Sequence, residues 1–318
     1  SRFDALRHGR RGAVFVGREA EVARLKERLA AARFGRGQIV LVAGEAGLGK
    51  SRLVRHLLEE AGQAASDSVI LQCSPYNTGS PFHPLRYHIG RARGAASADL
   101  PEAALGKLAA HLALAGEVSP ERLSLLAELM LIPGADPEPL RGLSPVEKRA
   151  RTMGHLAALM VAAARSSPVL IVEDVQWIDP STAELIESVV PVLRTMPVLL
   201  VVTARPGPFP PWLEKAEARI VQLERLRDPE VRALIRAAAG DAALPETVAA
   251  AIVDRADGVP IFAEELTRGY LEAEARGHGE DELARVPASL AESILARLDR
   301  LANGRKIAST AAAIGREF

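Results

Sequence analysis

The strongest chemical signal in the sequence is a glycine-rich segment that ends in lysine and serine, Gly44-Glu45-Ala46-Gly47-Leu48-Gly49-Lys50-Ser51. Glycine lets the backbone curl so that successive N–H groups point at phosphate oxygens, and the N-terminus of a following helix adds partial positive charge. In this pattern Lys50 would reach the β- and γ-phosphates, and Ser51 would ligate Mg²⁺ through its hydroxyl. We therefore expect residues 44–51, with the adjacent Arg52, to form a P-loop that holds a nucleoside triphosphate.

Two acidic residues, Glu173 and Asp174, follow the apolar run at residues 169–172. Ligands of open α/β sheets bind at the carboxyl ends of the strands, where these acids would lie. Glu173 is expected to face Mg²⁺, and Asp174 to polarise the attacking water as general base. Because an aspartate is more usual at the first position, the two roles are exchangeable at this stage. The structural alternative is that the acids cap the next helix.

A second apolar run, residues 198–203, also ends in polar residues, namely Thr203 and Arg205. If this run is a strand beside the one that carries Glu173, both side chains would point towards the γ-phosphate. Arg205 would then distinguish ATP from ADP by charge-assisted hydrogen bonds. The alternative is an arginine that forms a salt bridge at the start of a loop. Asp179, directly before a proline, is expected to be a helix N-cap or a loop residue.

These residues need a sheet to bring them together, and the apolar pattern predicts one. Short runs that are apolar throughout predict strands at 38–42, 69–73, 169–172, 198–203 and 220–223. Helical periodicity precedes the first strand, at 19–33, and lies between later strands at 50–60, 146–165 and 182–195. Strands that alternate with helices indicate an α/β fold whose parallel sheet is covered on both faces.

Two parts of the chain do not follow the alternation. Residues 74–150 are punctuated by prolines, with helical patches such as 121–131, and no function is assigned to them. After residue 223 the strands stop, and residues 228–277 are predicted to form helices broken at Gly240, Pro245 and Gly258-Val259-Pro260.

Composition restricts the possible partners and surroundings. The 40 basic and 40 acidic residues balance, which gives no electrostatic argument for nucleic acid or for an anionic membrane. No apolar run approaches the roughly 20 residues that cross a bilayer, and the N-terminus lacks a signal-peptide core. With Cys73 as the single cysteine, no internal disulfide is possible. We expect a cytoplasmic protein without a membrane partner. His83 and His88 match no common metal-ligand spacing.

Five separated motifs together resemble a known family. They are Phe15-Val16-Gly17-Arg18-Glu19, the P-loop, Glu173-Asp174-Val175-Gln176-Trp177-Ile178-Asp179, Thr203-Ala204-Arg205 and Asp257-Gly258-Val259-Pro260-Ile261-Phe262-Ala263-Glu264-Glu265-Leu266. In this order they resemble the AAA-like P-loop ATPase domain of the STAND class. The most similar members follow class III adenylate/guanylate cyclase domains in bacterial multidomain signalling proteins.

The resemblance implies further site residues and a domain plan. Val16, Gly17 and Arg18 would neighbour the adenine or ribose, Pro260 would touch the base, and Arg205 would be the sensor arginine. The plan is a linker at 1–12, an ATPase core at 13–224, a helical lid at 225–285 and the truncated start of a winged-helix region at 286–318. It implies ATP or ADP with Mg²⁺ as cofactors, a cyclase-like domain before the chain and helical repeats after it. A homo-oligomer is compatible with this plan.

Four functions are compatible with these residues. The preferred one is a slow ATPase that acts as a switch in a larger signalling protein. The second is a scaffold that keeps its nucleotide without turnover. A small-molecule kinase would need a basic lid, and residues 228–277 contain no arginine cluster of that kind. Nucleic-acid remodelling by an AAA-like ring is the fourth, and the neutral charge argues against it.

Overall fold

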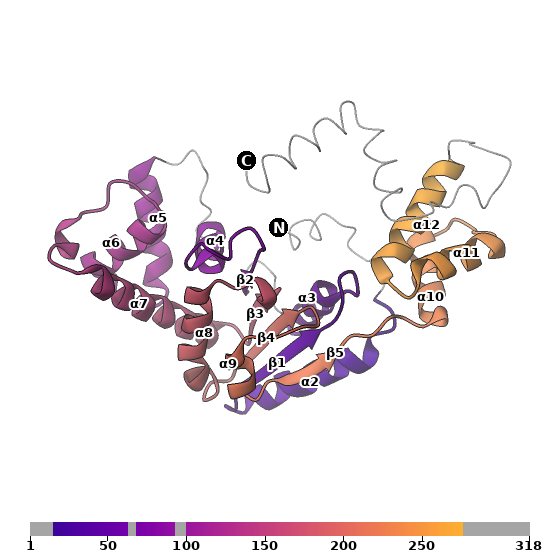
Figure 1. Cartoon of the computed structure of the whole chain (residues 1–318), viewed down its shortest axis with the longest axis horizontal. Coiled ribbons are helices and arrows are strands. Elements are labelled where there is room, and N and C mark those ends of the chain that lie inside the picture. Colours follow the sequence, from indigo (N-terminus) through magenta and orange to yellow (C-terminus); the bar gives the residue numbers. More distant parts are fainter. Residues whose placement is uncertain (1–14, 63–67, 93–99, 276–318) are drawn as a thin grey trace. The chain divides into compact units, whose positions relative to one another are not determined.

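The computed structural model describes residues 15–62, 68–92 and 100–275, which form two compact units (Figure 1). The sheet unit contains residues 20–45 and 50–223. The described part of the helical unit contains residues 15–19, 46–49 and 224–275. The linker predicted at 1–12 and the winged-helix region predicted at 286–318 lie outside the described residues.

The sheet unit is built on five parallel strands in the order β2-β3-β4-β1-β5. Their bounds are β1 Gln38–Ala43, β2 Val69–Gln72, β3 Val169–Glu173, β4 Leu199–Ala204 and β5 Arg219–Gln222. The prediction of an α/β fold with a parallel sheet is confirmed. β4 lies between β1 and β3 and pairs with both. It therefore separates the strand that leads into the P-loop from the strand that carries Glu173.

Both faces of this sheet are covered, because successive strand residues point to opposite faces and both sets are buried. In β1, Ile39 and Leu41 belong to one large apolar cluster, while Val40 and Val42 point the other way and are fully buried. The edge strand β5 differs, since only Val221 of its four residues is buried. Long buried runs of Val, Leu and Ile therefore form the central strands, as parallel sheets require.

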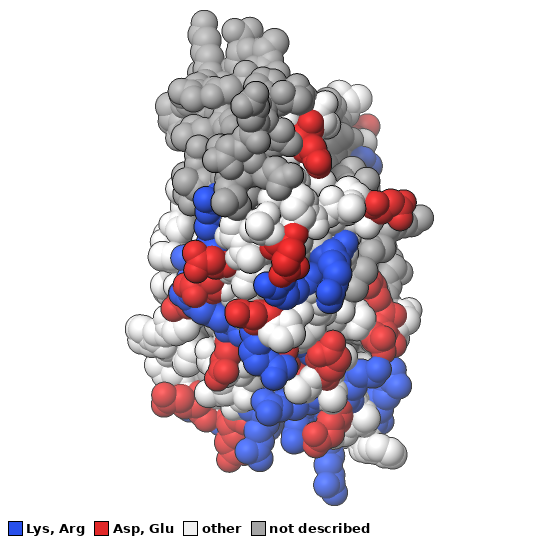
Figure 2. Space-filling view, turned by 90° about the vertical axis from the view of Figure 1, so that its right-hand side faces the viewer, with Lys and Arg blue, Asp and Glu red and all other residues white. Residues whose placement is uncertain are grey.

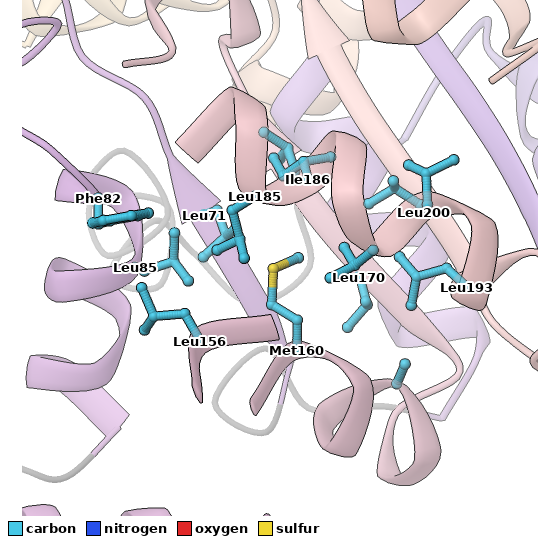
Figure 3. Close-up of a cluster of buried hydrophobic side chains, with 14 of the residues drawn as sticks. Leu71, Phe82, Leu85, Leu156, Met160, Leu170, Leu185, Ile186, Leu193 and Leu200 are labelled. Atoms are coloured by element: carbon cyan, nitrogen blue, oxygen red, sulfur yellow. The ribbon is translucent and has the colours of Figure 1, made fainter. Parts of the chain in front are cut away.

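Helices α2 Glu19–Arg33, α3 Lys50–Glu60, α8 Pro180–Leu193 and α9 Pro211–Lys215 alternate with the strands. Figure 3 shows part of the core that α7 (Pro145–Ser166) and α8 form with the strands and with α4 (His83–Ala92). Its members come from β2 (Leu71), β3 (Leu170), β4 (Leu200), α4 (Leu85), α7 (Leu156 and Met160) and α8 (Leu185, Ile186 and Leu193), together with Phe82.

A helical insertion lies between β2 and β3. It contains α4 His83–Ala92, α5 Pro101–Ala113, α6 Pro120–Leu129, the short 3₁₀ helix η1 Glu138–Leu140 and α7 Pro145–Ser166. Three of these helices begin with a proline, a position where the missing N–H removes no hydrogen bond. Ser144 caps α7 and forms a reciprocal capping box with Glu147. Pro101, Pro120 and Pro145 therefore start helices, while the other prolines of this segment do not begin an α-helix.

The described helical unit contains α10 Asp228–Ala239, α11 Glu246–Ala256 and α12 Pro260–Glu274, which pack around their own apolar core. The breaks fall where the sequence predicts them. Gly258 has a φ of +70°, and an added Cβ would lie 2.5 Å from the Leu226 carbonyl oxygen, so only glycine fits. Across both units, no helix of the described residues combines the length and apolarity that spanning a membrane requires.

Candidate functional site

The P-loop connects β1 to α3, as the sequence predicts for its context. Gly47 and Gly49 have φ values of +85° and +91°, which side chains strongly disfavour. The Gly44 N–H donates to the Ala204 carbonyl at 3.2 Å, which fixes the start of the loop to the end of β4. The glycines therefore serve the curled backbone that a phosphate cradle needs.

Lys50 is 8% exposed, and its ammonium lies against the loop itself. Its Nζ donates to the carbonyl oxygens of Gly44 at 2.6 Å and Glu45 at 2.9 Å. A buried ammonium requires such partners, because leaving it without them would cost several kcal/mol. Ser51 and Arg52, on the first turn of α3, are half-buried. The loop thus carries a desolvated positive charge at the carboxyl edge of the sheet.

Glu173 and Asp174 lie at the same edge, since all five strands are parallel. Glu173 is the last residue of β3 and is 3% exposed. Its Oε2 accepts a hydrogen bond from the Gln72 side chain of the neighbouring strand at 3.0 Å. A carboxylate buried in this position suits a hard cation such as Mg²⁺, which prefers oxygen ligands.

Asp174 leaves the strand in the left-handed conformation, with φ 54° and ψ 47°. Aspartate tolerates this region better than most residues. Its N–H donates to the Thr203 hydroxyl at 3.0 Å, so β4 holds the backbone of this residue in place. The Asp174 side chain is only partly buried, as a group that must meet a water molecule would be.

Gln176 is a site residue that the motif reasoning does not single out. Its Nε2 donates to Asp174 Oδ1 at 3.4 Å, and its Oε1 accepts the N–H of Arg205 at 3.2 Å. One amide thus joins the acidic turn to the end of β4. The signal in the sequence is a polar amide two residues after the acid. Its bond to Arg205 depends on strand order and is not visible there.

Arg205 follows β4 directly, and its half-buried side chain starts from the edge that carries the acids.

Asp179, in contrast, is a structural residue. Its Oδ1 accepts the N–H groups of Thr182 at 2.9 Å and of Phe82 at 3.0 Å, and its Oδ2 accepts the Thr182 hydroxyl at 2.6 Å. The expectation that Asp179 caps a helix is confirmed.

Cys73, directly after β2, is buried near the acids of this edge. Burial raises the pKa of the Cys73 thiol, and the charges of Asp179, Asp174 and Glu173 raise it further. The thiol is therefore neutral and contributes packing. No group of three or more His, Cys, Asp or Glu side chains suited to a metal occurs within residues 15–62, 68–92 and 100–275. The assignment of Ser51 and Glu173 to Mg²⁺ stays a prediction.

The tip of the P-loop, residues 46–49, belongs to the helical unit. Arg18 is 7% exposed, and its Nη2 donates to the carbonyl oxygens of Glu224 at 2.5 Å and Leu48 at 3.4 Å. An added Cβ on Gly47 would lie 2.8 Å from Ile261 Cγ2 and 3.0 Å from Val259 Cγ1. The start of α12 therefore packs closely on the loop tip.

The other residues implied by the resemblance lie in the same unit. Gly17 has a φ of +70°, and an added Cβ would meet the Glu230 side chain at 2.9 Å. Val16 is half-buried, and half-buried Pro260 is the first residue of α12. The roles of Val16, Gly17, Arg18 and Pro260 towards a nucleotide stay predictions.

Comparison with known proteins gives a family and a longer relative. The family model described as "AAA ATPase domain" matches residues 14–202. The uncharacterized protein R02095 of Rhizobium meliloti (strain 1021) is 32% identical over 329 residues, which cover 96% of this chain and 30% of that protein. The chain thus spans about a third of the length of this relative.

Solved structures share the fold at low sequence identity. A point mutant of RuvB from Thermotoga maritima has a TM-score of 0.51 and 17% identity, covering 86% of this chain and 68% of that one. The T. maritima RuvB Holliday junction branch migration motor has a TM-score of 0.50 and 18% identity, covering 87% of this chain and 70% of that one. At these identities the likeness concerns the fold alone.

Proposed function

Because the chain belongs to the AAA ATPase domain family, whose model matches more than half of it, we propose that it binds ATP in the P-loop and hydrolyses it slowly. The observation that carries this proposal is the shared edge of the parallel sheet. There the Lys50 ammonium, which donates to the Gly44 carbonyl just after β1, and the acids Glu173 and Asp174 at the end of β3 lie at the carboxyl ends of the two strands beside β4. A cation and two acids in this arrangement suit a triphosphate, Mg²⁺ and an attacking water.

Each residue at this edge has a proposed task. Residues 44–52 bind the phosphates, with Lys50 on the β- and γ-phosphates. Ser51 and Glu173 hold Mg²⁺, which when bound neutralises charge on the phosphate oxygens. Asp174 accepts a proton from water as its oxygen attacks the γ-phosphorus, the bond to the bridging oxygen breaks, and ADP and phosphate leave. Arg205 contacts the γ-phosphate and distinguishes ATP from ADP.

The preference for Asp174 as general base rests on the difference between the two acids. Glu173 is buried and accepts a hydrogen bond from Gln72, which suits a fixed metal ligand. Asp174 is more exposed, and Thr203 and Gln176 hold its backbone and side chain. A proton acceptor needs access to water together with a fixed position, and Asp174 combines both.

We infer that the module is a switch within a larger signalling protein. The length of the R. meliloti relative supports further domains beside the chain, for which the resemblance suggests a cyclase-like domain before it and helical repeats after it. Nucleotide exchange would be sensed where Gly47 packs on Val259 and Ile261. Contacts of the nucleotide with Val16, Gly17, Arg18 and Pro260 belong to the same proposal.

Nucleic-acid remodelling is the alternative that the RuvB likeness raises, since that protein is a branch migration motor. The charge of the chain does not favour it. Acidic and basic side chains are interspersed over the face shown in Figure 2, and its coloured residues form no broad basic area. A backbone-binding surface would collect lysine and arginine on one side.

The proposal is tested by single-turnover phosphate release from ATP with Mg²⁺. We expect the wild-type protein to release phosphate, and Lys50→Ala to lose nucleotide binding and release together. Lys26→Ala is the matched control, because Lys26 is an exposed lysine of α2 that pairs with Glu60. Tight nucleotide binding without release at any protein concentration would favour the scaffold alternative. Absence of binding by the wild-type protein would overturn both.

A further inference from the structure

A cavity of about 390 Å³ lies in the sheet unit, away from the residues assigned above to the nucleotide. Its walls come from α4, α6, α7, the start of α8 and the turn before α4. This volume falls within the range of small-molecule sites, which run from about 300 to 1,000 Å³. None of the residues that line it has a role in the proposed hydrolysis.

The charged side chains that line this cavity are mostly basic. Lys148 pairs with Glu128 at 3.0 Å, and Arg149 pairs with Glu184 with an Nη1–Oε1 distance of 3.3 Å. The third cation, Arg86 on α4, is half-buried, and among the described residues its guanidinium has no hydrogen-bonding or acidic partner. A half-buried guanidinium without a carboxylate partner can form charge-assisted hydrogen bonds with a bound anion.

The cavity also has an apolar part of its wall, to which Phe82 and Leu125 contribute. These side chains are 4% and 2% exposed. Phe82 has a φ of +57°, which is a strained conformation for a bulky side chain and costs on the order of 1–3 kcal/mol. Its N–H donates to the Asp179 carboxylate at 3.0 Å, which holds this conformation. Strained residues cluster at functional sites, ligand clamps among them, so the conformation of Phe82 makes this cavity a candidate site.

We propose that this cavity binds a small organic anion, which places its acidic group on Arg86 and its apolar body on Phe82 and Leu125. The acidic group is a phosphate, a sulfonate or a carboxylate, since each accepts two hydrogen bonds from a guanidinium. The half-buried Ser181 hydroxyl at the start of α8 also lines the cavity. The site is separate from the P-loop and does not depend on the proposed hydrolysis.

The test is calorimetric titration of the full chain with 1-naphthyl phosphate, which joins an acidic group to an apolar body. We expect 1:1 binding, and much weaker binding of 1-naphthol and of inorganic phosphate. Arg86→Gln should weaken binding about tenfold or more, because a charge-assisted hydrogen bond is lost. Arg91→Gln is the matched control, because it removes the same charge from the same helix outside the cavity.

A second variant keeps the test valid if Arg86→Gln does not fold. Ser181→Asp places an acid in the first turn of α8, where it favours the helix dipole, while it repels an anion in the cavity. Lys50→Ala separates this site from the P-loop, and it should bind the probe like the wild-type protein. Lack of probe binding by the wild-type protein, or its loss in Lys50→Ala with retention in Arg86→Gln, overturns the proposal.

Discussion

At the scale of single residues, the position of Asp174 is set by its backbone. The Thr203 hydroxyl accepts its N–H, and its left-handed φ turns the chain out of the strand. Gln176 then links its carboxylate to the Arg205 backbone. A proton acceptor held in this way loses little entropy when a substrate arrives.

The prediction at this scale concerns Asp174→Asn. The amide keeps the size and the left-handed backbone but cannot take a proton, so we expect single-turnover hydrolysis to fall by about 10²–10⁴-fold. ATP affinity, measured by titration with the nucleotide, should change little. Glu173→Gln is the variant to compare, because the loss of a metal ligand should change the Mg²⁺ dependence of hydrolysis. Loss of Mg²⁺ dependence in Asp174→Asn rather than in Glu173→Gln would mean that the two roles are exchanged.

At the scale of elements, the sequence predicts what depends on local pattern. The strands and the helices α2 and α3 follow from apolar runs and helical spacing, and their observed ends agree closely with the predicted ones. The insertion is predicted only in part, because α5, α6 and α7 begin at Pro101, Pro120 and Pro145, and a proline in the sequence does not show by itself whether it breaks a helix or starts one.

The contacts that complete the site are beyond local pattern. The sequence predicts that the strands before Asp174 and Thr203 are neighbours, but it does not predict the hydrogen bond between the two residues. The role of Gln176 cannot be predicted from the sequence at all. Asp179 is expected as a cap, but its bond to the Phe82 N–H joins residues 97 positions apart. Such contacts depend on the packing of β2, the insertion and α8, which no periodicity encodes.

The prediction at this scale concerns Asp179→Ala. The change removes the N-cap of α8, which is worth about 1 kcal/mol, and leaves the buried Phe82 N–H without its acceptor, which costs about 1–3 kcal/mol more. We expect the free energy of unfolding in urea to fall by about 2–4 kcal/mol. Asp179→Asn keeps an acceptor oxygen and should lose much less. Equal losses in the two variants would contradict this account of the residue.

At the scale of the whole molecule, the sequence indicates neutrality, with 40 residues of each charge. It does not indicate where charges are left without a partner. The Arg86 guanidinium stands out only after α4, α6, α7 and α8 have come together around a cavity. Without a strong overall field, selectivity for an anion must come from such local groups.

The pH dependence of global stability gives a prediction at this scale. Burial, together with the charges of His111 and Arg91, lowers the pKa of His88 on α4 from about 6.5 to about 4. As the pH falls below about 6.5, the unfolded chain takes up this proton before the folded protein does, so folding loses stability progressively until about pH 4.

Urea unfolding at pH values between about 4 and 7 measures this effect. We expect the free energy of unfolding to fall towards acid, with a shallower slope in His88→Gln, which cannot take up the proton. Carboxylates contribute to the slope in both proteins, so the comparison isolates the histidine. An unchanged slope in the variant would show that His88 does not carry the effect.

The contacts of Lys50 have a consequence for the protein before it meets a nucleotide. Its ammonium gives up most of its hydration shell during folding and receives the carbonyl oxygens of Gly44 and Glu45 in return. An arriving phosphate therefore meets a charge that is already largely dehydrated, a smaller reorganisation than stripping water from a lysine in solvent. Part of the desolvation of this lysine therefore takes place when the chain folds, before any nucleotide is bound.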